Sequence, residues 1–417
     1  MNFPCVHTIH HHYYCFRILR MVKKTHVVWK LIPFSAVAFL GFLAVGLPLP
    51  VLSLYVHERL GFGTLIVGSV IGLQSLATLL TRQYAGRLSD TRGPKLTSLV
   101  GLLFASVAGL SYLAAGVLVQ HPVESLALLC VGRLLLGLAE SLFITALAAW
   151  SIGRVGSEHA GRAMAWSGIA MYAALAVGAP VGLVLYRAAG FSAVAACAVL
   201  APLVGAATAS TWKAFAVERM AARTSFLRML RMIWAPGLGM ALASSGVGTI
   251  SAFLPLRYSM AAWPHAGFTL AAFGAAYIAM RLVLGGLPDR LGGYRTGLAS
   301  LFAETIGLGL IALAGTPLTA LAGATITGLG YSLVFPSLGV EAMRRVPGEN
   351  RGLVIGAYLA CFDLGLAIAG PGAGAVARSY GIPGAFAAAM ATALSALILI
   401  CVDSRCLRKS VPIGNQI

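Results

Sequence analysis

Long apolar runs recur along most of the chain, and short connections rich in glycine, proline and charged residues separate them. A helix needs roughly 20 apolar residues to cross a bilayer, so each run predicts one membrane-spanning helix. The pattern gives twelve spans, at about 31–56, 62–81, 96–119, 125–150, 163–186, 191–211, 233–256, 267–287, 296–315, 318–340, 353–377 and 383–402. Pro48 and Pro50 are expected to break the first span, because proline removes backbone hydrogen bonds.

The two halves of the chain carry related motifs. After the second and the eighth span, four residues recur at an offset of 199: Arg82, Gly86, Leu88 and Asp90 match Arg281, Gly285, Leu287 and Asp289. Near the fifth span of each half the offset is 191: Ala179, Pro180 and Gly190 match Gly370, Pro371 and Gly381. We therefore predict an all-α integral membrane protein with 12 transmembrane helices, arranged as two pseudo-symmetric six-helix bundles.

The predicted division of the chain follows from these spans. It has an N-terminal extension at 1–30, a first bundle at 31–211, a linker at 212–232, a second bundle at 233–402 and a C-terminal tail at 403–417. In the linker, Arg and Met alternate with small residues, which favours an amphipathic helix on the membrane surface. The histidine-rich stretch at 1–20 defines no metal site, and it is either a disordered extension or an early start before Met21.

Composition excludes a soluble protein. Hydrophobic residues make up 59% of the chain and charged residues only 10%, whereas soluble domains carry about 25% charged residues. The formal charge of +18 comes from basic residues scattered over short loops, so no nucleic-acid partner is expected. Most of the 30 Lys and Arg lie on one side of the predicted topology. This places both termini and the linker in the cytoplasm, next to anionic membrane lipids.

Enzymatic and cofactor chemistry have no signal in the sequence. There is no phosphate-binding loop of the Gly-x-x-x-x-Gly-Lys-Ser/Thr type, so ATP-driven transport is not expected. No Ser, His and Asp constellation lies at membrane depth, and the seven cysteines show neither metal-ligand spacing nor a disulfide framework. We predict no enzyme activity, no cofactor and no metal.

The charged turn after the second span resembles a known signature. The pattern Gly-x-x-x-Asp-x-x-Gly-x-Lys at 86–95 resembles the loop motif of the major facilitator superfamily, and 285–292 resembles its second-half echo. Thr91 and Pro94 stand where that family often has basic residues. Together with the spans, the resemblance covers the chain from about residue 30 and implies a secondary transporter that works by alternating access. It also implies a cytoplasmic latch formed by Gly86, Arg87, Asp90, Arg92, Gly285, Asp289 and Arg290.

A cation lies well inside the fourth span. An arginine facing lipid at this depth would cost about 3 kcal/mol or more, so Arg133 must face the protein interior or a wet cavity. Arg133 and Gly137 resemble the fourth-helix signature of the superfamily, which is implicated in proton coupling or in latching to the loop. Glu140 lies two turns further on the same helix face, about 10 Å away. Both side chains are expected to face one central cavity, and a structural ion pair between helices is the alternative.

Carboxyl groups at membrane depth are candidates for proton exchange. Asp363 lies in the middle of the eleventh span and Glu304 in the ninth. A carboxyl group in an apolar site can take up and release a proton near neutral pH, and we choose Asp363 and Glu140, with Arg133, as the proton-coupling residues. For Glu304 a structural role is favoured. Four further residues are candidates for hydrogen bonds to a substrate: Gln74, Tyr172, Tyr331 and Tyr358.

Three more segments, at 46–52, 330–339 and 362–371, resemble one group within the superfamily. They are similar to the YhhS/YfcJ-type group of bacterial inner-membrane carriers. We expect a monomer in the bacterial cell inner membrane, with a small-molecule substrate, protons and membrane lipids as partners. The favoured function is proton-coupled efflux of a sugar or drug-like solute, with import of a sugar or organic acid as the alternative. A degenerate antiporter-like motif at 178–182 supports efflux. A membrane scaffold or receptor without transport would need no protonatable cavity residues.

Overall fold

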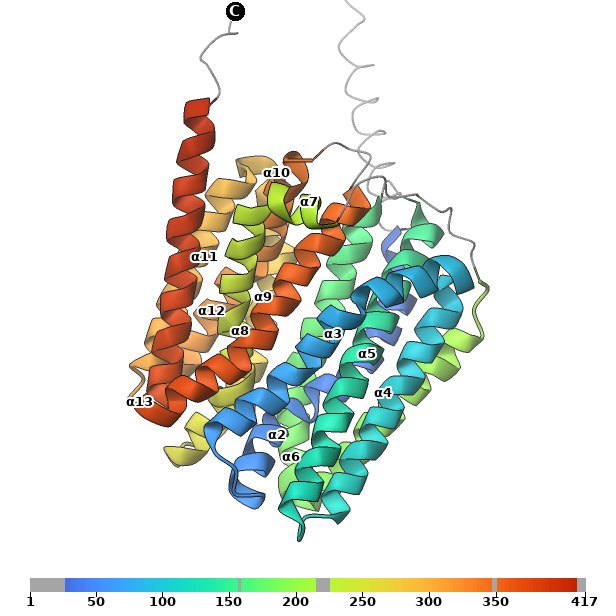
Figure 1. The fold of residues 1–417 in the computed structure, drawn as a ribbon, viewed down its shortest axis with the longest axis vertical. Helices are drawn as coiled ribbons and strands as arrows, with labels where there is room; N and C mark the ends of the chain where they lie inside the picture. The colour runs from blue at the N-terminus through green and yellow to red at the C-terminus, as the bar shows by residue number, and fades with distance from the viewer. Residues whose placement is uncertain (1–26, 157–158, 215–225, 347–350, 411–417) are drawn as a thin grey trace, which may run out of the picture.

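The chain forms a bundle of long helices in the computed structural model, which describes residues 27–156, 159–214, 226–346 and 351–410 (Figure 1). These residues contain no β-strand. The elements are a first helix at 27–46, α2 (Leu49–Leu54), a π-helical turn (Tyr55–Arg59), α3 (Thr64–Arg92), α4 (Pro94–Val117), α5 (Pro122–Val155), α6 (Ala160–Ser210), α7 (Phe226–Met232), α8 (Trp234–Met260), α9 (Ala266–Leu284), α10 (Leu287–Leu291), α11 (Gly293–Ala312), α12 (Pro317–Arg344) and α13 (Arg351–Ser410).

The described helices supply the twelve predicted spans. Nine of them are long and apolar enough to cross a membrane, counting Val27–Arg59 as one. Two of the nine, α6 and α13, each make two crossings, because the backbone turns sharply at Gly190 and Gly381. Both glycines have positive φ, 77° and 71°, a region in which a side chain is strained. These helices give eleven crossings, and α11 supplies the twelfth. The matched kinks at Gly190 and Gly381 confirm the repeat.

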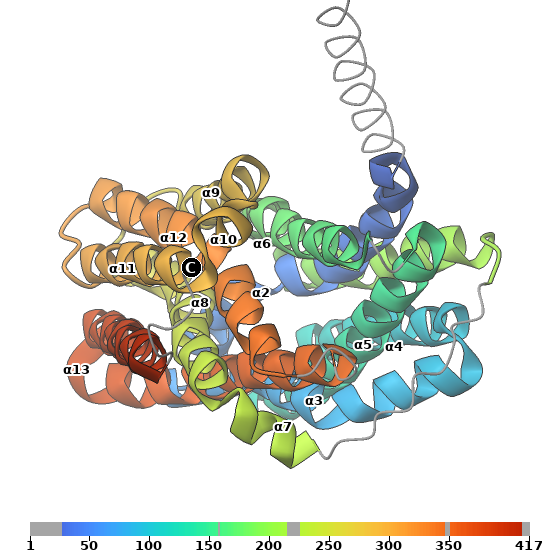
Figure 2. The same ribbon diagram turned by 90° about the horizontal axis from the view of Figure 1, so that it is seen from above.

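The two bundles lie side by side, the first in blue to green and the second in yellow to red (Figures 1 and 2). The first helix is interrupted at residues 47–48 before α2, as the prolines predict. In the chain segment that connects the two bundles, α7 is a short helix that contains Arg228 and Arg231 and buries Met229. Of the predicted linker helix at 212–232, residues 215–225 lie outside the described residues. We call the end of the bundle with α7 and α10 the linker end, and the opposite one the far end.

Two helix crossings join the halves, and glycines bring the helices close. Where α3 crosses α13, a Cβ on Gly68 would collide with the carbonyl of Gly370, and the reverse also holds. Where α9 crosses α6, a Cβ on Gly267 would lie 2.8 Å from the Cα of Pro180. The offset of 199 residues relates Gly68 to Gly267, and the offset of 191 relates Gly370 to Ala179, which precedes Pro180. The two crossings are therefore equivalent positions of the repeat. Small residues at such contacts let membrane helices approach closely.

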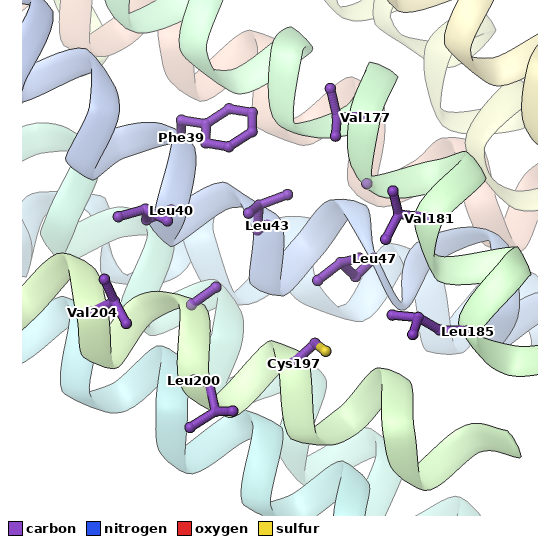
Figure 3. Close-up of a pocket in the computed structure, with 12 residues that line it drawn as sticks. Phe39, Leu40, Leu43, Leu47, Val177, Val181, Leu185, Cys197, Leu200 and Val204 are labelled. Atoms are coloured by element: carbon purple, nitrogen blue, oxygen red, sulfur yellow. The ribbon is translucent and has the colours of Figure 1, made fainter. Parts of the chain in front are cut away.

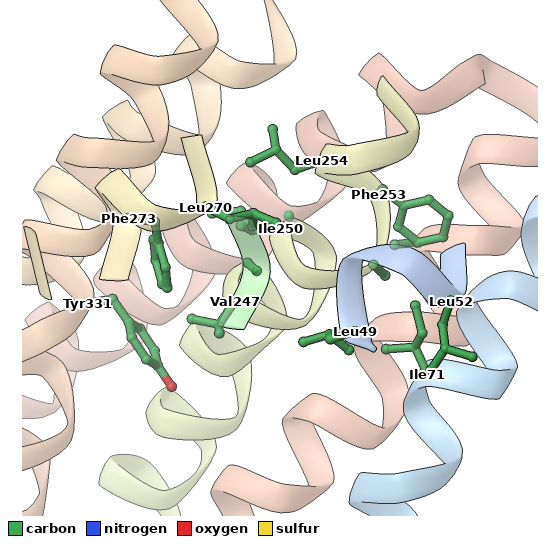
Figure 4. Packing of buried hydrophobic residues seen from close by; sticks show 14 of the residues in the cluster. Leu49, Leu52, Ile71, Val247, Ile250, Phe253, Leu254, Leu270, Phe273 and Tyr331 are labelled. Carbon is green, nitrogen blue, oxygen red and sulfur yellow. The ribbon is translucent and has the colours of Figure 1, made fainter. Parts of the chain in front are cut away.

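Apolar packing continues across the boundary between the halves. Leu49 and Ile71 of the first half belong to the same buried cluster as Val247 and Phe253 of α8 (Figure 4). All four side chains are less than 10% exposed. The halves are therefore held together by close helix contacts and a shared apolar core, within which the few polar side chains stand out.

Candidate functional site

A small cavity lies between the halves. Its volume is about 110 Å³, well below the roughly 300–1,000 Å³ typical of ligand pockets, so in this conformation it is nearly closed. Most of the polar side chains in its wall come from the first half, the second half adds Ser251, and apolar groups of both halves form the rest. Its lining includes Gln74, Arg133, Glu140, Tyr172 and Phe362.

Beside this cavity, an ion pair joins the two halves. Nε and Nη2 of Arg82 in α3 both lie 2.6 Å from Oδ2 of Asp363 in α13. The side chains are 15% and 3% exposed. Because charge-assisted hydrogen bonds are the strongest type in proteins, this contact is the most specific polar connection between the bundles among the described residues.

Glu140 lies in the first half near the same arginine. Its Oε2 accepts a hydrogen bond of 2.6 Å from Nε2 of Gln74, and the charges of Arg82 and Arg133 act on it. Gln74 Oε1 is buried and has no partner in the described part of the chain. Arg133 and Glu140, which were expected to face one cavity, both line this one together with Gln74, and the amide connects α3 to the carboxyl group of α5.

Arg133 faces the protein interior, and its hydrogen-bond partners are backbone carbonyls. It lines the cavity but is only 2% exposed. Its Nε and Nη2 donate to the backbone carbonyls of Val70 and Ile71 at 3.2 and 2.8 Å, and the Tyr112 side chain lies beside its guanidinium. Among the described residues it forms no ion pair with Glu140 or Asp363. The side chain thus ties α5 to α3 within the first half.

The second crossing holds a cluster of tyrosines. Tyr172 of α6 stacks on Tyr277 of α9 with ring centroids 3.6 Å apart, and Tyr331 packs edge-on against Tyr172 with ring centroids 6.4 Å apart. Nη2 of Arg281 donates to the Tyr277 hydroxyl at 2.5 Å. The hydroxyl of Tyr358 donates to a backbone carbonyl of α12 at 2.9 Å. Two predicted substrate residues, Tyr172 and Tyr331, are therefore neighbours, while Tyr358 already has a hydrogen-bond partner.

Glu304 lies apart from the interface, inside the second bundle. It is fully buried in α11, and neither carboxyl oxygen has a hydrogen-bond partner in the described part of the chain. A Cβ added to Gly246 of α8 would lie 2.8 Å from its Oε1. Glu304 thus lies against a helix of its own bundle and near Tyr331, and the structural role favoured for it stays a prediction.

The predicted latch residues lie at the linker end and are not engaged with one another. Asp90, Arg87 and Arg92 are exposed, as are Asp289 and Arg290. None of them has an ion pair with another described residue. The signature lysine of the first motif, Lys95, does have partners, because its Nζ donates to the carbonyls of Ser210 and Trp212 at 2.7 and 2.6 Å. Of the glycines of the latch, Gly86 lies inside α3 and Gly285 is the C-cap of α9.

A larger hollow of about 370 Å³ lies elsewhere, between the first helix and α6 (Figure 3). Every residue that lines it is apolar, including Phe39, Leu43, Val181 and Leu200. Val181 and Leu200 are 43% and 58% exposed. A surface of this kind suits contact with lipid chains and offers no polar group to orient a solute.

Comparison with known proteins agrees with this architecture. The family model of the Major Facilitator Superfamily matches residues 34–264 and 237–405. The chain belongs to this superfamily. An MFS-type transporter of Salmonella typhimurium, described as uncharacterized, is 41% identical over 86% of this chain and 92% of its own length. YhhS of Escherichia coli, described in the same way, is 39% identical over 87% and 89%.

Solved structures share the fold. The nucleoside transporter NupG matches with a TM-score of 0.71 and 15% identity, over 91% of this chain and 99% of its own. The human organic anion transporter MFSD10 matches with a TM-score of 0.66 and 16% identity, over 89% and 98%. This superfamily member is thus a multi-pass membrane transporter for a small molecule, and its resemblance to the YhhS group is confirmed.

Sequence reasoning did not assign three side chains of the interface. Arg82 and Arg281 were recognised as repeat markers only, and Tyr277 was not selected. The two arginines did carry a signal, because each lies within a long helix, four residues before the glycine of the repeated turn motif, and a cation within a membrane helix needs a partner. What the sequence did not show is which helix faces each arginine.

Proposed function

We propose that this superfamily member is a proton-coupled exporter of a small organic solute, such as a sugar or a drug-like compound, and that Asp363 carries the proton. The observation behind the proposal is the Arg82–Asp363 ion pair. It joins the two halves next to a cavity lined by both. A protonatable group at this place can bias the equilibrium between two arrangements of the halves.

The proposed coupling depends on which carboxyl group Arg82 faces. When Asp363 is ionised, its charge holds Arg82 and favours the arrangement seen here. When Asp363 takes up a proton, that attraction is lost, and Arg82 remains close to the charge of Glu140 in its own half. The halves can then rock apart at this crossing, which is how transporters built from repeats alternate access to a midplane site.

The second arrangement would engage the latch. In it, Asp90 would pair with Arg87, Arg92 or a facing helix, as the family resemblance implies, and Asp289 and Arg290 would do the same in the second half. The exposed state of these side chains leaves them free to do so. In the proposed orientation the linker end faces the cytoplasm of a bacterial cell, and the protein acts as a monomer in the inner membrane.

Everted membrane vesicles test this proposal. Vesicles containing the protein are loaded with a pH-sensitive dye, an acidic interior is set, and arabinose, gluconate or ethidium is added outside. Export coupled to protons predicts that one compound class dissipates the gradient, and that vesicles without the protein do not respond. Proton-driven uptake in right-side-out vesicles with no response in everted ones would instead show import, and no proton movement in either would refute coupling.

A further inference from the structure

The two crossings between the halves are equivalent in the repeat but differ in charge. The offset of 199 residues places Arg281 at the position of Arg82, and the offset of 191 places Tyr172 at the position of Asp363. At the first crossing the arginine meets a carboxylate. At the second, the arginine meets a tyrosine pair. One of two equivalent arginines therefore has no carboxylate partner among the described residues.

Arg281 has donors to spare. A guanidinium carries five N–H groups, and within the described ranges Arg281 forms one hydrogen bond, from Nη2 to the Tyr277 hydroxyl. Its Nε is buried and has no acceptor among those residues. The guanidinium also lies over the Tyr277 ring, with Cζ 5.2 Å from the centroid. A cation held at membrane depth without a counter-ion is costly, and its planar fork matches a carboxylate.

The cluster around Arg281 is continuous with the central cavity. Tyr172 lines that cavity and stacks on Tyr277. Arg281 lies one helical turn from Tyr277 toward the linker end, as Arg82 lies toward that end from Gln74. The hydroxyl of Tyr331 is buried in the same cluster, next to Tyr172 and Ser244. The Nε of Arg281, which has no acceptor among the described residues, thus lies on the linker side of the cavity, behind an aromatic wall.

We propose that Arg281 binds the carboxylate of the transported solute, so that the substrate is a small organic anion. Tyr172, Tyr277 and Tyr331 form the wall against which the remainder of the solute packs. The other two arginines of the interface are already occupied, Arg82 by Asp363 and Arg133 by backbone carbonyls. This inference rests on the proposed function, because it names the substrate class of the same cavity.

The test is a binding measurement at equilibrium, without a proton gradient. The protein in lipid nanodiscs is titrated with two matched pairs of compounds, benzoate against benzamide and gluconate against glucose, and with chloride at equal ionic strength. The midpoint of thermal unfolding reports binding. The variants are Arg281→Gln, Arg281→Lys and, as control, Arg257→Gln. Arg257 also has one hydrogen bond and a buried, unpartnered Nε, but it donates to the Ala314 carbonyl and stacks on Trp263, outside the cavity lining.

The expected result is that the carboxylate of at least one pair raises the midpoint and its neutral partner does not. Arg281→Gln should weaken this binding at least tenfold, Arg281→Lys should recover part of it, and Arg257→Gln should bind as the wild type does. Equal binding by Arg281→Gln, an equal shift with chloride, or no shift with either carboxylate would overturn the inference.

The two proposals fail in different ways. Carboxylate binding that depends on Arg281, without any proton movement in vesicles, would contradict the proposed coupling alone. Proton movement driven by glucose or benzamide, with no response to either carboxylate, would contradict the anion site alone.

Discussion

Replacing Asp363 by asparagine tests the ion pair between the halves. The amide keeps the shape of the side chain but removes the charge that faces Arg82 at 2.6 Å. Removing one partner of a buried pair costs about 3–5 kcal/mol. Because the Arg82 side chain is 15% exposed and lies near Glu140, we take the lower end, about 3 kcal/mol, which corresponds to roughly a 100-fold change in an equilibrium.

The arrangement of the halves seen here should therefore lose about two orders of magnitude in relative population in Asp363→Asn. More importantly, the variant has no carboxyl group to exchange a proton at this place. We expect the protein to insert and fold, to lose proton-driven transport, and to retain exchange of labelled for unlabelled substrate without a gradient. The assay is the vesicle measurement with the pH-sensitive dye, followed by counterflow in proteoliposomes.

The chain offers a matched control for this experiment. Asp403 pairs with Arg345 inside the second bundle, and these side chains are 11% and 17% exposed, similar to the pair between the halves. Asp403→Asn should lower thermal stability but leave proton-driven transport in place. Wild-type proton-driven transport by Asp363→Asn would refute the assignment, and equal loss in both variants would show that the effect is structural.

Three further predictions concern packing and the repeat. Gly370→Val should lower stability by about 1–3 kcal/mol and slow transport, because its side chain collides with the Gly68 carbonyl; an unchanged melting temperature would contradict this close contact. Glu304→Gln should keep both stability and proton coupling, since Glu304 lies away from the interface; loss of coupling would give Glu304 a part in the mechanism. Gly292→Ala should cost about 1–3 kcal/mol, measured by thermal unfolding, because Gly292 has φ 90°; wild-type stability would refute the strain argument.

The fold could be predicted from the sequence because each signal is local. Apolar run length gives the spans, and matched residues at fixed offsets give the two halves. Gly190 and Gly381 were identified as equivalent from sequence, and both prove to be kinks with positive φ. Local signals also identified Arg133 as an interior cation, since that follows from depth in the membrane alone.

The site was harder to predict because its contacts are long-range. Arg82 and Asp363 are 281 residues apart, and nothing in either segment specifies the other as partner. The partner of Arg133 was left open by the sequence, and backbone carbonyls of α3 satisfy two of its donors. Helix packing, which decides such choices, depends on many weak contacts that no single motif records.

The sequence also did not show that the predicted latch residues would be exposed in this arrangement of the halves. A transporter sequence must support two arrangements of its halves, so some polar groups are satisfied in only one of them. Here the helices are in close contact at Gly68 and Gly267, toward the far end, and Arg82 is paired with Asp363. At the linker end, Asp90 and Asp289 are exposed and make no ion pair with another described residue. Leaving the carboxylates of Asp90 and Asp289 unpaired costs little free energy in this arrangement, because water solvates them at the linker end. The motif is therefore compatible with this structure without being used in it, and its partners are to be sought in the arrangement where the linker ends meet.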